Sequence, residues 1–343
     1  MLYKTLIIDS IGEQIEGFKT FTFKKHQGID YKAGQYITFV QKITHEEIRR
    51  SYSIVSAPLL NEPLTIGVKR IENGVFSRQL IDHAKIGDEL LSSGAGGLFT
   101  LPDNLSNFRQ IFFLAAGSGI TPIYSLMKTV LHCHESIQVV LIYSNPTPQK
   151  TIFFSELKEL EKKFSQRIRL QFLYSNSPDL SLARLNRELL VQLAHKHAIC
   201  DFENMLFYIC GPDAYMRMCT YTLQEQKVPR ENIRKETFII QQKHIPKLDP
   251  PDKDSHLVTV YHGNETYHLN VQYPDSILKA GKRQNIILPY SCETGMCGNC
   301  VAKCINGNVW LSYNEVLTEK DLKEGLTLTC VGHPVGGDVV LNI

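Results

Sequence analysis

The spacing of the cysteines near the C-terminus constrains the fold of this chain more than any other feature of its sequence. Cys292-x4-Cys297-x2-Cys300 is followed, after twenty-nine intervening residues, by Cys330. Four thiolates are the soft ligands that satisfy two tetrahedral irons bridged by sulfide. A zinc ribbon would need a second C-x2-C pair, which the sequence does not contain. The spacing therefore predicts a [2Fe–2S] cluster on these four cysteines, and Cys304 is expected to be a bystander in a strand.

The residues between these cysteines also suit a loop that wraps a cluster. Gly295 and Gly298 permit backbone angles that turn amide N–H groups toward the sulfurs. Ser291 and Thr294 supply hydroxyl donors. Hydrogen bonds of this kind stabilise the reduced cluster and tune its potential.

The hydrophobic pattern divides the chain into four segments. Short β runs such as 51–55 and 64–68, with one helix over about 77–84, predict an antiparallel β-barrel for residues 1–104. Buried strands alternate with helices in residues 105–240, which predicts a parallel α/β sheet. The expected strands there are 111–115, 138–143, 169–174 and 205–210, and 155–164 is an expected helix. The polar, proline-rich residues 241–255 predict a linker to a compact domain over 256–343.

Composition and charge exclude several classes of function. The formal net charge of +2 over 343 residues gives no basic stripe for nucleic acid. No run approaches ~18 apolar residues, so no membrane span is expected. The N-terminus lacks the apolar core of a signal peptide, and the cysteine cluster suits a reducing compartment. We therefore expect a cytoplasmic protein.

A second motif, Arg50-x-Tyr52-Ser53, has the chemistry of a flavin site. Arginine suits a phosphate, an aromatic ring suits stacking on a flat cofactor, and a small hydroxyl suits the reactive N5 atom. All three residues are expected on one strand, where alternate residues share a face. Gly74 and Ser77 then open the predicted helix, whose N-terminal amides favour a second phosphate.

Two further motifs predict a nicotinamide site at the carboxyl ends of the parallel strands. Gly117-Ser118-Gly119-Ile120-Thr121-Pro122 lies where a buried strand meets a helix, which suits a pyrophosphate. Cys210-Gly211-Pro212 ends the strand over 205–210. Ligands of open α/β sheets bind at this edge, so Cys210 is expected near the reacting nicotinamide.

Together these motifs resemble known families. Residues 1–238 resemble the ferredoxin–NADP reductase family. The strings 288–300 and 328–334 resemble plant-type ferredoxins, which implies a β-grasp fold for 256–343. The order flavin barrel, nicotinamide domain and ferredoxin domain is similar to that of the reductase components of bacterial oxygenases.

The resemblance implies FAD as the flavin. The implied flavin contacts are Arg50, Tyr52, Ser53, Gly74 and Ser77. The implied nicotinamide contacts are Gly117, Gly119, Thr121, Pro122, Cys210, Gly211 and Pro212. Ser53 and Cys210 are expected to act at the reacting atoms, together with Phe238 over the flavin ring and Glu236 beside it.

Two departures from the family pattern leave the cofactors partly open. Relatives that prefer a 2′-phosphate carry a string like N-R-T where this chain has Asn145-Pro146-Thr147, so NADH and NADPH both remain alternatives. The Gly-rich stretch 94–99 also differs from the family pattern, so FMN remains an alternative to FAD.

The implied activity is electron transfer from NAD(P)H, through the flavin and the cluster, to an oxygenase or hydroxylase. A reductase of a ring-hydroxylating dioxygenase is an alternative with the same chemistry. A redox sensor is a third reading, disfavoured because the sequence shows no DNA-binding or signalling module.

Overall fold

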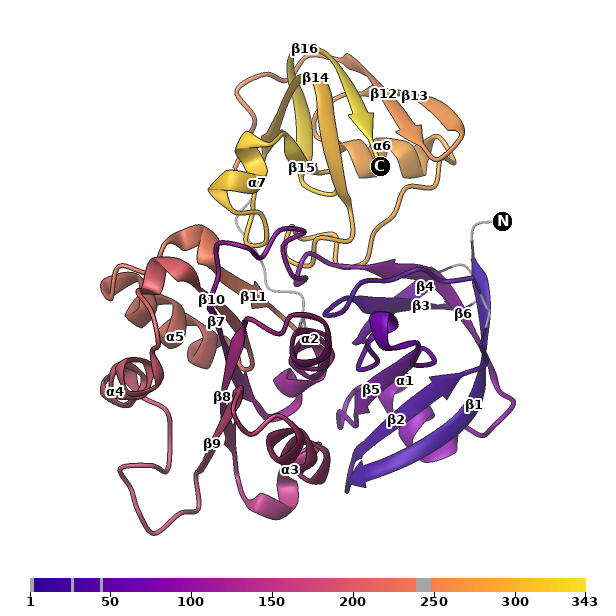
Figure 1. Cartoon of the computed structure of the whole chain (residues 1–343). Coiled ribbons are helices and arrows are strands. Elements are labelled where there is room, and N and C mark those ends of the chain that lie inside the picture. The colour runs from indigo at the N-terminus through magenta and orange to yellow at the C-terminus, as the bar shows by residue number, and fades with distance from the viewer. Residues whose placement is uncertain (1–2, 26–27, 44–45, 239–247) are drawn as a thin grey trace. The chain divides into compact units, whose positions relative to one another are not determined.

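The computed structural model describes residues 3–25, 28–43, 46–238 and 248–343. The described chain forms two compact units, one ending at Phe238 and the other running from residue 248 to Ile343 (Figure 1).

The first part of the larger unit is a six-stranded antiparallel sheet in the order β4-β3-β6-β1-β2-β5. Its strands are β1 Lys4–Ile15, β2 Phe18–Phe23, β3 Tyr36–Ile43, β4 Glu46–Ser53, β5 Thr65–Lys69 and β6 Glu89–Gly96. Alternation along the strands places Phe21, Phe23 and Phe39 in a closed apolar core. The antiparallel fold predicted for this segment is confirmed.

The predicted helix over 77–84 begins earlier than expected. Helix α1 spans Val75–Arg78 and continues as a π-helical turn over Gln79–His83. Ser77 lies inside the first turn, and its Oγ donates to the carbonyl of Gly74 at 3.1 Å. Gly74 occupies the N-cap position, in agreement with the expectation that the stretch from Gly74 to Ser77 opens the helix.

The second part of the larger unit is a five-stranded parallel sheet in the order β11-β10-β7-β8-β9. Its strands are β7 Gln110–Ala116, β8 Gln138–Asn145, β9 Ile168–Tyr174, β10 Met205–Cys210 and β11 Ile233–Glu236. Its helices are α2 Ile120–Cys133, α3 Phe154–Lys163, α4 Arg187–His197 and α5 Asp213–Glu225. The parallel α/β fold is confirmed, and the expected elements lie within two residues of those observed.

Both faces of this parallel sheet are covered, as its continuous apolar strands require. Helices α2 and α3 pack on the face that shares a core with Phe18 and Val55 of the barrel. Helices α4 and α5 pack on the opposite face (Figure 1). The barrel and the parallel sheet therefore share one apolar core inside a single unit.

The C-terminal unit is a mixed five-stranded sheet in the order β13-β12-β16-β14-β15. Its elements are β12 His256–His262, β13 Glu265–Val271, α6 Ile277–Arg283, β14 Val301–Leu311, α7 Glu319–Lys323, β15 Leu326–Leu328 and β16 Gly332–Asn342. Strands β12 and β16 pair in parallel, and helix α6 packs against β13 and β16. This arrangement is the β-grasp fold that the resemblance implied.

The predicted linker over 241–255 is only partly described, because 241–247 lie outside the described residues. Residues 248–255 form no helix or strand, but they carry specific contacts. The Asp252 carboxylate lies 2.7 Å from His256 Nε2 and accepts from the amide of Gly336 at 2.6 Å. The later part of this segment is therefore bound to the C-terminal unit, although its composition predicted a plain spacer.

Candidate functional site

The four predicted cluster cysteines lie together in the loop before β14 and in the turn after β15. Cys300 and Cys330 are buried, whereas Cys292 and Cys297 are half-buried. The Cys292 side chain interacts with those of Cys297 and Cys330, and the Cys330 side chain also interacts with that of Cys300. Four neighbouring thiols are the donor set that a [2Fe–2S] cluster requires, so these residues fit that group. Cys304 lies apart from them in β14.

The glycines of this loop adopt the backbone angles expected from the sequence. Gly295 has a φ of 77° and Gly298 a φ of 76°, both in the left-handed region. A β-carbon on Gly295 would lie 2.8 Å from the carbonyl oxygen of Tyr313. The amide of Thr294 donates to the Cys292 sulfur at 3.4 Å. The loop therefore presents at least one amide to a ligand sulfur, as predicted.

Arg50 and Tyr52 lie on one face of strand β4. They pair with Phe39 and Ile37 of β3, two positions apart. Arg50 is exposed, while the Tyr52 ring stacks on Phe76 with centroids 5.9 Å apart. Burial raises the pKa of the Tyr52 phenol well above its ordinary value, so the ring is neutral. This face thus offers a cation beside a supported aromatic ring.

Ser53 points to the other face of β4, because it directly follows Tyr52. It is buried at the end of the strand, opposite Tyr36. The prediction that these residues share a strand is correct, but the shared face extends only to Arg50 and Tyr52.

Gly74 and Ser77 close a tight turn at the start of α1. The Ser77 hydroxyl is buried and accepts from the amide of Ile71 at 3.2 Å. A β-carbon on Gly74 would lie 2.5 Å from this hydroxyl. The Ser77 side chain therefore stabilises the turn, and the groups left for a phosphate are backbone amides.

The two predicted nicotinamide motifs meet at the carboxyl edge of the parallel sheet. Strands β7 and β10 pair so that Ala115 lies beside Cys210, and the segments after them touch. A β-carbon on Gly211 would lie 2.9 Å from that of Ala116. Gly117 has a φ of 54° and no atom within 4 Å of its β-carbon position, which leaves open space there. The glycines therefore combine close packing with an open face for a ligand.

Glu236 lies next to Cys210 across the pairing of β10 with β11. Burial raises the pKa of the Glu236 carboxyl to about 8. Among the described residues, its Oε2 atom has no hydrogen-bond partner. Burial, and then the nearby Glu236, raise the pKa of the Cys210 thiol well above its ordinary value. Phe238 is half-buried just beyond, packed against the shared apolar core.

The carboxyl end of β8 holds Asn145, the first residue of the string compared above with the 2′-phosphate motif of relatives. Asn145 is 5% exposed, and its amide lies beside the Tyr143 hydroxyl. The following Thr147 accepts from the amide of Lys150 at 3.2 Å. This position lies at the carboxyl edge of the parallel sheet, where ligands of such sheets bind.

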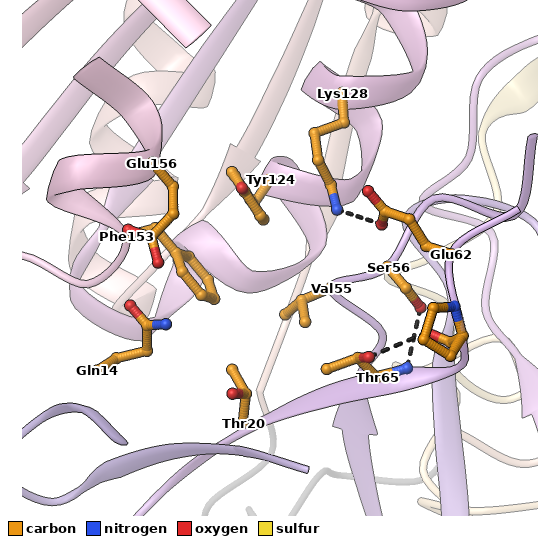
Figure 2. Close-up of a pocket in the computed structure, with 11 residues that line it drawn as sticks. Gln14, Thr20, Val55, Ser56, Glu62, Thr65, Tyr124, Lys128, Phe153 and Glu156 are labelled. Carbon is orange, nitrogen blue, oxygen red and sulfur yellow. Dashed lines mark hydrogen bonds and ion pairs between the residues drawn. The ribbon is translucent and has the colours of Figure 1, made fainter. Parts of the chain in front are cut away.

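A pocket of ≈ 230 Å³ opens where the barrel meets helices α2 and α3 (Figure 2). Val55 and Thr65 line it from the barrel, and Tyr124, Lys128 and Phe153 line it from the parallel-sheet half. Lys128 forms an ion pair with Glu62 at its rim. This pair was not predicted, although a lone lysine among the apolar residues of α2 was a visible signal.

Three family models match the chain in the order that the sequence predicted. An oxidoreductase FAD-binding domain covers residues 7–101, and an oxidoreductase NAD-binding domain covers 113–221. A 2Fe-2S iron-sulfur cluster binding domain covers 260–335. No helix within the described residues is long and apolar enough to cross a membrane.

Full-length relatives carry the same combination. One component of 1,2-phenylacetyl-CoA epoxidase from Escherichia coli K12 is 30% identical over 99% of this chain and 97% of its own length. The ferredoxin reductase component of 3-ketosteroid-9-alpha-monooxygenase from Mycobacterium tuberculosis H37Rv is 30% identical over 90% of this chain and 84% of its own. The phthalate dioxygenase reductase structure shares the fold, with a TM-score of 0.59 and 23% identity over 99% of this chain and 98% of that one.

The matching domains agree with the geometry of the sites described above, from the Arg50 strand to the four converging thiols. The chain is therefore an oxidoreductase, and it belongs to the family of oxygenase reductase components that join FAD-binding, NAD-binding and [2Fe–2S] domains.

Proposed function

We propose that this chain carries electrons from NAD(P)H to an oxygenase, with the site residues in the roles that follow. The observation that supports this most directly is the convergence of the four cysteine side chains, in a chain that also has a flavin and a nicotinamide module. When bound, the flavin accepts two electrons as hydride and the cluster carries one electron at a time.

In this proposal Arg50 holds a flavin phosphate, Tyr52 stacks on the ring and Ser53 lies near N5. Gly74 and Ser77 shape the turn whose amides meet the second phosphate. The exposed guanidinium of Arg50 beside the stacked Tyr52 ring supports these roles. FAD is the proposed flavin, and the proposed domain bounds are 1–104, 105–240 and 256–343, with 241–255 between the last two.

The nicotinamide nucleotide is proposed to bind along the edge formed by Gly117, Gly119, Thr121 and Pro122 and by Cys210, Gly211 and Pro212. Cys210 and Glu236 then face the reacting ring, and Phe238 covers the flavin until the nucleotide arrives. The raised pKa values of the Cys210 thiol and the Glu236 carboxyl keep both groups neutral at pH 7. Neutral groups suit a pocket in which a hydride, not a proton, is transferred.

The proposed electron acceptor is the oxygenase component of a system similar to phenylacetyl-CoA epoxidase, which would place the chain in phenylacetate catabolism. The 30% identity to the epoxidase component over nearly the whole of both chains supports this acceptor. The same identity to a ketosteroid monooxygenase reductase supports a second candidate, an oxygenase that acts on another substrate. We propose a cytoplasmic location, because a reducing compartment keeps the cluster cysteines as thiolates.

Two electron acceptors test the proposed route. NADH and NADPH oxidation would be measured with ferricyanide, which can take electrons at the flavin, and with cytochrome c, which is expected to take them from the cluster. Cys330→Ser should keep ferricyanide reduction and lose most cytochrome c reduction, because the cluster lacks one ligand. Cys304→Ser is the matched control and should keep both activities. Equal cytochrome c reduction by wild type and Cys330→Ser would refute the route through the cluster.

A further inference from the structure

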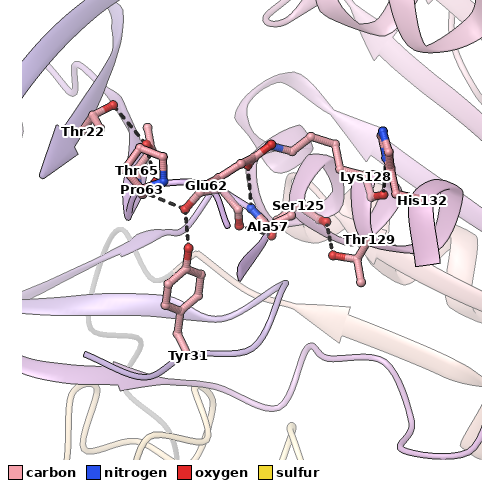
Figure 3. Close-up of polar contacts among 11 residues, drawn as sticks. Thr22, Tyr31, Ala57, Glu62, Pro63, Thr65, Ser125, Lys128, Thr129 and His132 are labelled. Atoms are coloured by element: carbon pink, nitrogen blue, oxygen red, sulfur yellow. Dashed lines mark hydrogen bonds and ion pairs between the residues drawn. The ribbon is translucent and has the colours of Figure 1, made fainter. Parts of the chain in front are cut away.

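A set of polar contacts, here called the polar joint, connects the barrel to helix α2 at the rim of the pocket (Figure 3). It consists of Ser56, Ala57 and Glu62 from the segment between β4 and β5, and of Ser125 and Lys128 from α2. Lys128 Nζ and Glu62 Oε2 form an ion pair, and Ser125 Oγ donates to the carbonyl of Ser56 at 2.6 Å. Two directional contacts thus span the boundary between the halves.

The barrel side of the polar joint is held in place by contacts that do not involve Lys128. The amide of Ala57 donates to Glu62 Oε2 at 2.7 Å, which orients the carboxylate. The Ser56 hydroxyl accepts from the amide of Thr65 at 3.0 Å and lies 2.7 Å from the hydroxyl of Tyr31. These hydrogen bonds join the segment to two other parts of the barrel. A displacement of Glu62 would therefore be transmitted to the rest of the barrel.

The α2 side is equally constrained. Lys128 is 9% exposed, and its Nζ lies 4.7 Å from the centroid of the Tyr124 ring. That ring stacks on Phe153 at 4.5 Å, and Phe153 packs edge-on against Phe18 of the barrel at 5.9 Å. A buried ammonium group without a partner is costly, so Lys128 stabilises only the arrangement in which Glu62 meets it.

The polar joint lies close in sequence to both proposed reacting segments. Ser56 is the third residue after Ser53, and Ser125 is the fourth after Thr121, about one helical turn along α2. Thr121 itself reaches the barrel, since a β-carbon on Gly67 would lie 2.7 Å from its Cγ2 atom. A shift at the polar joint would therefore move the flavin strand relative to the nicotinamide loop.

The apolar core that the halves share does not select one alignment by itself, because hydrophobic contact is non-directional. Hydrogen bonds and ion pairs prefer a narrow range of geometry, especially when one partner is charged. The polar contacts therefore add directional restraints to the packing of the core.

We propose that Glu62 and Lys128 are positioning residues for hydride transfer. By joining the segment after Ser53 to the helix after Thr121, they hold the nicotinamide ring at the correct distance and angle from the flavin. Neither residue is proposed to touch the flavin or the nucleotide. The inference rests on the proposed function and adds residues to it that lie outside the cofactor motifs.

Stopped-flow mixing of the flavin-loaded protein with saturating NADH or NADPH, without oxygen, tests this inference. Glu62→Gln and Lys128→Met should slow flavin bleaching about 10- to 100-fold, because a small misplacement of the reacting groups greatly lowers the reaction rate. Nucleotide affinity should not change, since the binding edge is intact. Lys128→Arg keeps the charge and should retain most of the rate. If Glu62→Gln fails to load flavin, Glu62→Asp, which withdraws the charge by one methylene, replaces it.

Glu225→Gln is the matched control. It removes an exposed ion pair with Arg187, 3.1 Å long, that lies wholly within the parallel-sheet half. This variant should bleach at the wild-type rate. A wild-type rate in the Glu62 and Lys128 variants, even with a lower melting temperature, would overturn the inference while leaving the reductase function intact. Wild-type protein that neither nucleotide bleaches would instead refute the proposed function.

Discussion

Gly119 lies so close to Cys210 that a β-carbon on the glycine would stand 2.1 Å from the cysteine's carbonyl oxygen. The glycine loop after β7 and the end of β10 are thus packed backbone against backbone. Since a carbonyl oxygen in a strand cannot rotate away as a flexible side chain can, only glycine is compatible with this contact.

Gly119→Ala is therefore expected to lower the melting temperature clearly and to abolish nucleotide-dependent flavin reduction. Gly117→Ala is the informative comparison, because its β-carbon would meet no atom within 4 Å. The left-handed backbone at this position should cost alanine only about 1–2 kcal/mol, so the protein folds. Its new methyl group would occupy the open face proposed for the pyrophosphate, and the KM for the nucleotide should rise. Equal melting temperatures for the two variants would contradict the packing argument.

The buried Glu236 carboxyl predicts a pH dependence of stability. Its pKa rises from 4.5 to about 8 on folding, because burial disfavours the charged form. Below pH 4.5 the carboxyl is protonated in both the folded and the unfolded state, so the residue does not change how the free energy of unfolding varies with pH. As pH rises toward 8 the unfolded state alone ionises, so stability falls by ~1.4 kcal/mol per unit at most.

Glu236→Gln removes this ionisable group while keeping its size. The melting temperature of wild type, relative to this variant, should therefore decrease steadily between pH 5 and pH 8. Thermal unfolding of both flavin-loaded proteins across that range measures the difference. If the melting temperatures of the two proteins changed equally with pH, the Glu236 side chain would not be buried as a neutral acid.

Arg50 is expected to contribute to flavin binding and little to folding. Its side chain is exposed, and its described contact is a 2.7 Å hydrogen bond from Nη1 to the carbonyl of the neighbouring Arg49. Arg50→Ala should weaken flavin binding about 10- to 100-fold, the usual effect of losing a charged hydrogen bond. The ratio of absorbance at the flavin and protein maxima reports loading. Lys85→Ala, at another exposed cation of the barrel, should load normally.

Local patterns in the sequence were sufficient to predict much of this molecule. The cluster cysteines could be assigned because their spacing reflects the geometry of one small cofactor. The strand over 205–210 was predicted at its observed bounds because an uninterrupted apolar run is buried on both faces.

The features that the sequence did not predict depend on contacts between distant residues. Glu62 and Lys128 are 66 positions apart, and no periodic pattern links them. The attachment of residues 248–255 to the C-terminal unit includes the hydrogen bond from the amide of Gly336 to Asp252, which composition does not reveal. The direction of Ser53, away from the face of Tyr52, follows from strand alternation and could have been foreseen. The burial of the Ser53 side chain could not be foreseen, because it depends on how the neighbouring strands pack.

The proposed route takes electrons from NAD(P)H into a flavin and on to the [2Fe–2S] cluster of the same chain. The most direct test is an anaerobic titration of the purified protein with NADH and with NADPH, followed by visible and EPR spectra. With at least one nucleotide, the flavin absorbance should bleach and the EPR signal of a reduced [2Fe–2S] cluster should appear. This EPR signal should be absent from Cys330→Ser. Protein that contains flavin and cluster but shows neither change with either nucleotide would contradict this route.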